Sequence, residues 1–138
     1  MGSICTSLSS CTVNTKKYTS SIKEIKIGMT LYKQEDVFVS SITKNIEEIA
    51  KEKESDGKYK ITMNILDAKG NLNNQNNQVD KFIAQDYDII CVNLVDRTAA
   101  AVIIDKAKAA NKPIIFFNRE PVEEDMERWN RLYYVGAE

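Results

Sequence analysis

Pro113-Ile-Ile-Phe-Phe-Asn-Arg-Glu-Pro121 is a short apolar run that ends in three polar side chains and a turn-forming proline. Two earlier segments share this design, an apolar run that leads directly into polar residues: Ile25-Lys-Ile-Gly-Met-Thr-Leu31 before Tyr32-Lys-Gln-Glu-Asp36, and Asp88-Ile-Ile-Cys-Val92 before Asn93-Leu-Val-Asp96. Open α/β sheets hold small ligands in the crevice outside the carboxyl ends of their strands. These segments therefore predict an α/β sheet with a ligand site at the edge where its strands end.

Strand-like and helix-like segments alternate along the chain, which predicts right-handed βαβ units on a parallel sheet. The expected strands cover residues 24–32, 58–66, 87–93, a run that begins at Pro113, and 132–135. The run at 58–66 alternates more than the others, as a strand near a sheet edge does. The predicted fold class is α/β, a doubly wound parallel sheet with helices on both faces.

The helices between these strands are predicted from apolar spacing. Asp36 is placed to cap a first helix, which ends at Ser55-Asp-Gly57. A further helix is predicted at residues 97–110, whose alanines permit close packing on a sheet. The apolar face of the first helix comprises Val39, Ile42, Ile46, Ile49 and Ala50. The amide-rich segment that starts at Gly70 belongs to a second helix, whose inner stripe is Leu72, Gln75, Val79, Phe82 and Ile83.

Length and composition bound the possible functions. A chain of 138 residues suits one domain with a single core. Its net charge is -1, from 19 basic and 20 acidic side chains interspersed along the sequence, so no basic field is present to hold nucleic acid. The chain has no histidine, which excludes histidine-dependent catalysis and removes the commonest zinc ligand. No apolar run approaches the roughly 18 to 20 residues of a membrane span.

The three cysteines have no C-x-x-C pair and describe neither a zinc knuckle nor a disulfide framework. Cys91 lies inside an apolar strand run, where a free thiol packs as a small hydrophobic group. Leu8-Ser-Ser-Cys11 has the form of a bacterial lipobox, which predicts lipidation of Cys11. The alternative is a chance match, because the basic and apolar regions of a signal peptide do not precede it. Residues 1–23 are polar and aperiodic, which predicts a flexible tether before a domain at 24–138.

Four residues at the expected strand ends are candidates for ligand contact. Asp36 either caps a helix, which the pattern alone favours, or offers its carboxylate oxygens to sugar hydroxyls. Phe38 is either a core residue, which the pattern alone favours, or an apolar platform for a pyranose ring. Asn118 both donates and accepts hydrogen bonds at a rigid strand end. Arg119 either touches a ligand or pairs with Glu120 at the surface.

Asn93 and Asp96 occupy the equivalent position after the strand at 87–93, where a turn and helix cap is favoured over ligand contact. The chain lacks G-x-G-x-x-G, a P-loop, a nucleophile paired with a base and a metal-ligand cluster. The late strand of a phosphorylation receiver would end in lysine, whereas here it ends in Val135-Gly136. The pattern therefore favours binding, without a metal, over catalysis.

Several motifs between residues 24 and 138 follow one another in an unbroken order that matches a known family. They are Lys26-Ile-Gly-Met-Thr-Leu-Tyr-Lys-Gln-Glu-Asp-Val-Phe38, Gln75-Asn-Asn-Gln-Val-Asp80, Val92-Asn-Leu-Val-Asp96, Pro113-Ile-Ile-Phe-Phe-Asn-Arg-Glu-Pro121 and Tyr133-Tyr-Val-Gly136. Together they resemble the bacterial galactose/glucose-binding proteins that feed sugar ABC transporters. The resemblance implies a type I periplasmic-binding-protein fold, in which two similar α/β lobes joined by a hinge close on a pyranose.

The resemblance also implies roles for individual residues. Asp36 would accept hydrogen bonds from sugar hydroxyls, Phe38 would stack on the ring and Asn118 would bond a further hydroxyl. Arg119 stands where the family often has lysine and is an expected neighbour of the ligand. The choice between glucose and galactose stays open.

The chain is expected to end where the family's backbone first crosses its hinge, so the second lobe and its calcium loop would be absent and no cofactor is expected. Such a lobe is expected to bind sugar weakly and to expose a sheet edge open to self-association. The expected partners are a monosaccharide and an ABC transporter permease or a sensor, in the periplasm or at the cell surface, with membrane contact only through a lipid on Cys11. The alternative function is a sugar-independent docking module for a transporter or a sensor kinase.

Overall fold

The strands of the described residues all lie in one parallel sheet. The computed structural model describes residues 2–5, 10–11 and 21–136, so most of the predicted tether and part of the lipobox lie outside the described residues. The strands are β1 (Lys23–Leu31), β2 (Tyr59–Asp67), β3 (Ile89–Val92), β4 (Ile114–Phe117) and β5 (Leu132–Val135). The helices are α1 (Val37–Glu54), α2 (Leu72–Ala84), η1 (Arg97–Ala99), α3 (Ala100–Ala109) and α4 (Glu123–Met126). The predicted α/β class is confirmed.

The strand order reverses at β1. In space the order is β2-β1-β3-β4-β5, and every neighbouring pair is parallel. The chain therefore passes from β1 to β2 on one side and then returns to β3 on the other. At such a reversal the loops that leave the two central strands diverge and open a crevice between them. This rule predicts a crevice at the carboxyl ends of β1 and β3. The expected edge position of β2 is confirmed.

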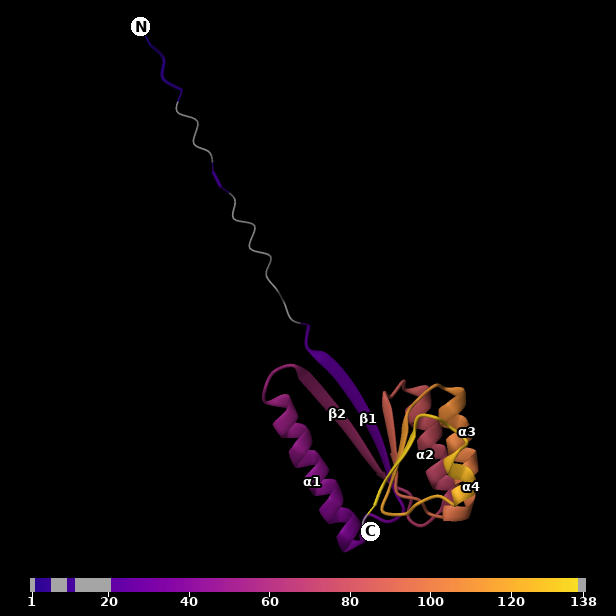
Figure 1. Cartoon of the computed structure of the whole chain (residues 1–138). Coiled ribbons are helices and arrows are strands. Elements are labelled where there is room, and N and C mark those ends of the chain that lie inside the picture. The colour runs from indigo at the N-terminus through magenta and orange to yellow at the C-terminus, as the bar shows by residue number, and fades with distance from the viewer. Residues whose placement is uncertain (1, 6–9, 12–20, 137–138) are drawn as a thin grey trace.

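The two faces of the sheet are covered unequally. Helix α1 lies alone on one face, and α2, α3 and α4 lie on the other (Figure 1). Alternation along each strand supplies both faces, because successive side chains point to opposite sides. In β4, for example, Ile114 and Phe116 pack with α2 and α3, whereas Phe117 packs with Val39 of α1. The sheet is thus doubly wound, as the sequence predicts.

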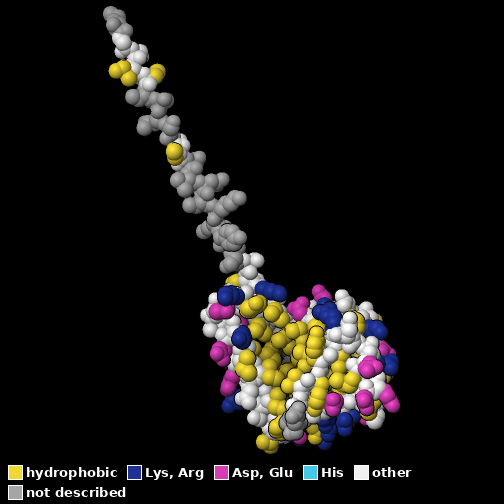
Figure 2. Space-filling view, in the orientation of Figure 1, with side chains coloured by type: hydrophobic (Ala, Val, Ile, Leu, Met, Phe, Trp, Pro, Cys, Tyr) yellow, Lys and Arg dark blue, Asp and Glu magenta, His cyan; other side chains and the backbone are white. Residues whose placement is uncertain are grey.

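Beside α1 the sheet carries an open groove lined by apolar side chains, from Ile27 and Met29 of β1 to Ile115 and Phe117 of β4. We call this the apolar groove; it appears as a continuous hydrophobic area on the face shown in Figure 2. Parallel sheets ordinarily have both faces covered. Ile49, predicted to lie on the inner face of α1, is 55% exposed, which contradicts that prediction. The reason is that no second helix of the described chain packs beside α1.

Gly28 lies in the middle of β1, where α2 approaches the sheet most closely. A Cβ atom at this position would overlap the ring of Phe82, which is fully buried and packs in a tilted arrangement against the ring of Tyr87, with 5.1 Å between the ring centres. The glycine therefore serves close packing of a helix against a strand rather than a turn.

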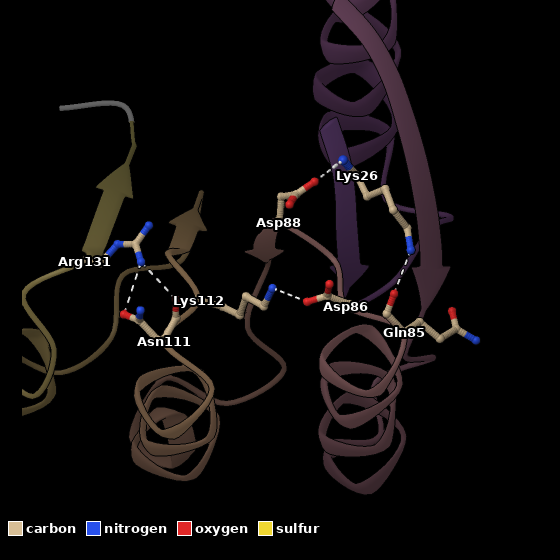
Figure 3. A network of polar contacts seen from close by, with 7 residues as sticks. All are labelled: Lys26, Gln85, Asp86, Asp88, Asn111, Lys112 and Arg131. Carbon is tan, nitrogen blue, oxygen red and sulfur yellow. Dashed lines mark hydrogen bonds and ion pairs between the residues drawn. The ribbon is translucent and has the colours of Figure 1, made fainter. Parts of the chain in front are cut away.

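Polar contacts link neighbouring segments at the opposite, amino-terminal edge of the sheet (Figure 3). The backbone N–H of Lys26 donates to Asp88 Oδ2 (2.7 Å), and its Nζ donates to the carbonyl of Gln85 (2.6 Å). Lys112 Nζ donates to Asp86 Oδ1 (2.6 Å), and this bond lowers the pKa of the Asp86 carboxyl. Asp86 has a φ of 55°, in the left-handed region in which α2 ends. These contacts lie at the edge away from the predicted site.

Replacing Gly28 by alanine is expected to destabilise the fold. The added methyl group forces Phe82 or the backbone of β1 to shift, and overpacking of this kind costs about 1–3 kcal/mol. Urea unfolding followed by circular dichroism measures the change in the free energy of unfolding. Gly2→Ala is the control, because a Cβ there meets no atom within 4 Å. Equal stability of the two variants would contradict this account of Gly28.

Cys91 is expected to resist alkylation in the native state. Burial among apolar side chains raises the pKa of its thiol to about 12, and only the thiolate is an effective nucleophile. Cys5 and Cys11 are exposed. Treatment with iodoacetamide at pH 8, followed by mass spectrometry, should modify those two thiols first, and Cys91 only after denaturation. Equal rates at all three thiols in the native chain would contradict the effect of the partly buried, apolar surroundings on Cys91.

Candidate functional site

The loop after β1 places Asp36 at the start of α1. Its Oδ1 accepts hydrogen bonds from the backbone N–H groups of Phe38 (2.9 Å) and Val39 (3.0 Å). These bonds satisfy two of the N–H groups that the first turn of a helix leaves without a partner. The capping role predicted from the sequence is confirmed. Because both bonds use the same oxygen, the other carboxylate oxygen takes no part in capping.

Phe38 is 56% exposed, so the prediction that it is a core residue is wrong. The neighbouring Val39 is fully buried, and one residue turns an α-helix by about 100°, which carries Phe38 away from the sheet. Phe38 instead lines a shallow pocket with Asn118, Phe117 and Val135. The structure therefore brings two of the predicted site residues, from α1 and from the end of β4, to one surface.

Asn118 is held in an unusual backbone conformation directly after β4. Its φ is 65°, and its backbone N–H donates to the carbonyl of Val135 (3.0 Å). A residue with a side chain rarely adopts positive φ, although asparagine tolerates it better than most. Such conformations cluster at binding and catalytic sites, where the surrounding structure enforces them. The left-handed turn ends the strand and sets the direction in which the Asn118 amide projects.

Arg119 is engaged with the protein rather than with Glu120. Its Nη1 donates to the carbonyls of Leu94 and Val95, each at 3.1 Å, and its guanidinium lies 4.1 Å from the centre of the Tyr32 ring. The alternative considered from the sequence, a surface ion pair of Arg119 with Glu120, does not form; Arg119 binds backbone carbonyls instead. Arg119 ties together the segments that follow β1, β3 and β4. Tyr32 is part of this arrangement, and no pattern in the sequence predicted its role.

Asn93 and Asp96, which follow β3, have different environments. Asp96 caps η1: its Oδ1 accepts from the N–H (2.8 Å) and the hydroxyl (2.7 Å) of Thr98, and these bonds lower the pKa of its carboxyl. The predicted capping role of Asp96 is confirmed. Asn93 is fully buried; its Oδ1 accepts from the N–H of Tyr32 (3.3 Å) and its Nδ2 donates to the carbonyl of Phe117 (3.3 Å). The prediction of a turn or cap for Asn93 is wrong, because its side chain bridges two strand ends.

Among the described residues, no group of three or more Cys, Asp or Glu side chains is arranged to hold a metal ion. In the same part of the chain, no helix combines the length and the apolar character needed to cross a membrane. The candidate site at the carboxyl edge, as predicted from the sequence, comprises a carboxylate, an aromatic ring, an amide and a guanidinium. This combination binds neutral polar molecules through hydrogen bonds and stacking.

The chain matches known proteins over most of its length. The family model described as "Periplasmic binding protein domain" matches residues 27–138, so the chain belongs to that family. It is 39% identical over 113 residues to the D-galactose/methyl-galactoside binding periplasmic protein MglB of Haemophilus influenzae, a match that covers 82% of this chain and 33% of the relative. It is 33% identical over 99 residues to a putative rhizopine-binding protein of Rhizobium meliloti, with 72% of this chain and 30% of the relative covered.

A solved structure supports the same fold. An ABC transporter solute binding protein from Bacillus halodurans with bound myo-inositol superposes with a TM-score of 0.66 at 27% identity, over 87% of this chain and 38% of that one. The predicted type I periplasmic-binding-protein lobe is confirmed. The chain spans about a third of the length of the curated relatives it matches.

Replacing Asp36 by alanine is expected to lower the free energy of unfolding by about 1 kcal/mol, because α1 loses its side-chain cap. Asp36→Asn keeps an oxygen in the capping position and should cost only a few tenths of that. Urea unfolding of the two variants beside the wild type measures both changes. If alanine were tolerated as well as asparagine, the two hydrogen bonds to Oδ1 would contribute nothing to stability.

Proposed function

We propose that residues 24–138 form the first lobe of the substrate-binding component of a sugar ABC transporter, which holds a glucose- or galactose-type pyranose in the cleft between two lobes. The observation that carries this proposal is the placement of Asp36, Phe38 and Asn118 at the carboxyl edge of the sheet, on segments that follow β1 and β4. The identity of 39% to a galactose-binding relative supports the same class of substrate.

Each of these side chains matches one part of a pyranose. A carboxylate accepts hydrogen bonds from neighbouring hydroxyl groups, and Asp36 keeps one oxygen outside the cap that can accept them. The exposed ring of Phe38 offers an apolar surface to the C–H groups of the sugar. The Asn118 amide both donates and accepts, as hydroxyl groups also do. The three contacts together distinguish a polyhydroxylated ring from an apolar ligand.

Arg119 contributes a further donor in this proposal. A guanidinium has five N–H groups, and the bonds to Leu94 and Val95 use Nη1, so Nη2 and Nε remain to donate to a sugar hydroxyl. Its stacking on Tyr32 fixes the plane of the group before the ligand arrives. A donor that is already ordered loses less conformational entropy when it binds.

The affinity of this lobe alone is expected to be low. Ligand pockets ordinarily bury most of a ligand's surface, whereas the pocket at Phe38 and Asn118 is shallow and faces the sugar from one side only. We therefore expect a dissociation constant of about 1 mM, which corresponds to about -4 kcal/mol. In the complete binding component, a second lobe would supply contacts to the other face of the sugar. We place this component outside the cytoplasm, with a transporter permease or a sensor as its protein partner and a lipid on Cys11 as its anchor.

A titration followed by two-dimensional amide NMR tests the proposal. D-Glucose, D-galactose and myo-inositol are added separately to the 138-residue chain, up to tens of millimolar. We expect saturable shifts of the amide signals of Asp36, Phe38 and Asn118 with at least one hexose. The three titrations also rank the ligands, and the ranking addresses which sugar the site prefers.

Two variants separate ligand contact from folding. Asp36→Asn keeps the cap of α1 but removes the charge, and Asn118→Gly keeps the left-handed backbone but removes the amide. Each should weaken hexose binding at least about tenfold, whereas Asp96→Asn, the same change at the exposed cap after β3, should leave binding unchanged. A dispersed spectrum without sugar-dependent shifts would overturn the proposal for this lobe and favour the sugar-independent docking module.

A further inference from the structure

Three polar side chains lie fully buried beneath the carboxyl edge of the sheet. They are Thr30 of β1, Gln75 of α2 and Asn93 directly after β3, and none has exposed surface. Buried polar groups are stable only when they are hydrogen-bonded, because an unsatisfied group costs about 1–3 kcal/mol. The apolar stripe of α2 would be continuous if Gln75 were leucine or methionine, so the bonds of this side chain need an explanation.

Gln75 forms hydrogen bonds with a carbonyl and with an N–H group of one short segment, residues 93–95. Its Nε2 donates to the carbonyl of Asn93 (2.9 Å), and its Oε1 accepts from the N–H of Val95 (2.9 Å). A backbone carbonyl only accepts and a backbone N–H only donates, so these two partners fix which end of the amide points where. Residues 93–95 are thereby bound to α2 as a strand would be bound to a neighbouring strand.

The same amide nitrogen also contacts β1. Gln75 Nε2 lies 3.3 Å from Thr30 Oγ1, and the Thr30 hydroxyl donates to Gln78 Oε1 (2.6 Å). Gln78 Nε2 in turn donates to the carbonyl of Asp67 at the end of β2 (2.8 Å). The donors in this series of hydrogen bonds all point the same way, from Gln75 through Thr30 and Gln78 to Asp67. One helix thus binds the ends of β1, β2 and β3 through neutral groups.

The segment that Gln75 holds is also the support of the candidate site. The carbonyls of Leu94 and Val95 accept from Arg119, and Asn93 donates to the carbonyl of Phe117, the residue before Asn118. A movement of residues 93–95 would therefore displace two predicted ligand contacts. The contacts of Gln75 are with the protein, on the α2 side of the sheet, so it acts only through these intermediates.

We propose that Gln75 is a positioning residue of the sugar site, which fixes residues 93–95 and through them sets the places of Asn118 and Arg119. This inference rests on the proposed function, because the residues that it positions are those assigned to the sugar. An amide meets the requirement at this point at every pH, since one end must donate to Asn93 and the other must accept from Val95.

The variant Gln75→Glu tests this requirement. An ionised carboxyl keeps the size of the side chain and accepts from Val95, but it has no proton for the Asn93 carbonyl. Burial raises the pKa of such a group, so the carboxyl regains a proton as the pH falls and then restores the donor. The groups bonded to Gln75 are neutral; the charged residues next to the network are Arg119, Asp67 and Asp96.

The experiment compares amide spectra and hexose titrations of the wild type, Gln75→Glu and Gln85→Glu between pH 5 and 8. Gln85→Glu makes the same chemical change at the exposed carboxyl end of α2. We expect Gln75→Glu to shift the Asn118 and Arg119 amide signals at pH 8 and to weaken hexose binding about tenfold. Both effects should reverse at pH 5, whereas the wild type and Gln85→Glu should show neither effect at either pH. Shifts confined to residues 30, 75 and 93–95, with unchanged affinity, would overturn the proposal.

Further variants keep the test decisive. If Gln75→Glu does not fold at pH 8, Gln75→Met keeps the length without a charge and should shift the same two signals at every pH. Trp129→Phe removes the hydrogen bond to the Lys112 carbonyl at the amino-terminal edge, so it lowers stability away from the network and should leave affinity unchanged. An equal loss of affinity in that variant would mean that Gln75 only stabilises the fold. If the wild type binds no hexose, the proposed function fails, while the signals of Asn118 and Arg119 still decide the positioning role.

Discussion

The parallel pairing of β1 with β3 is the constraint on which the candidate site depends. The ladder runs from Ile27 opposite Ile89 to Thr30 opposite Val92, and the side chain of Asn93 continues it by accepting from the Tyr32 N–H. Beyond that point the chain after β1 turns to α1 on one face and the chain after β3 turns to α3 on the other. The crevice is therefore a result of connectivity: it opens where two paired strands send their continuations in opposite directions.

The two edges of the sheet are stabilised by different kinds of polar interaction. At the amino-terminal edge the contacts are made by charged side chains near the surface, of which Lys112 and Asp86 form an ion pair. Surface ion pairs contribute little to stability and weaken with salt. At the carboxyl edge, buried amides of Gln75 and Asn93 replace charges. Neutral groups avoid the large desolvation cost of buried ions and still specify a single arrangement, because each amide has a donor end and an acceptor end. On the α2 side, the candidate site is thus supported by uncharged groups.

The sequence predicted the fold well because strand runs, helix caps and apolar stripes are local features. The edge position of β2, the cap at Asp36 and the polar edge of the sheet are all visible in short segments. The roles of Asn93, Arg119 and Tyr32 were not predicted, since they depend on which strand ends become neighbours in space. Phe38 shows the same limit: its spacing fits a core position, but only the orientation of α1 decides that it is exposed. A polar residue on an apolar stripe, Gln75, was the one available signal for the buried network.

The two oxygens of Asp36 have separate environments, and this separation bears on how ligand preference can diverge among relatives. One oxygen belongs to the helix and the other lies outside the cap. Serine, threonine or asparagine at this position would preserve the start of α1 while presenting a different group to the crevice. The ligand-facing chemistry can therefore change by single substitutions that leave the fold intact. The relatives named for galactoside and rhizopine ligands, and the solute binding protein solved with bound myo-inositol, are consistent with a scaffold that accommodates different ligands.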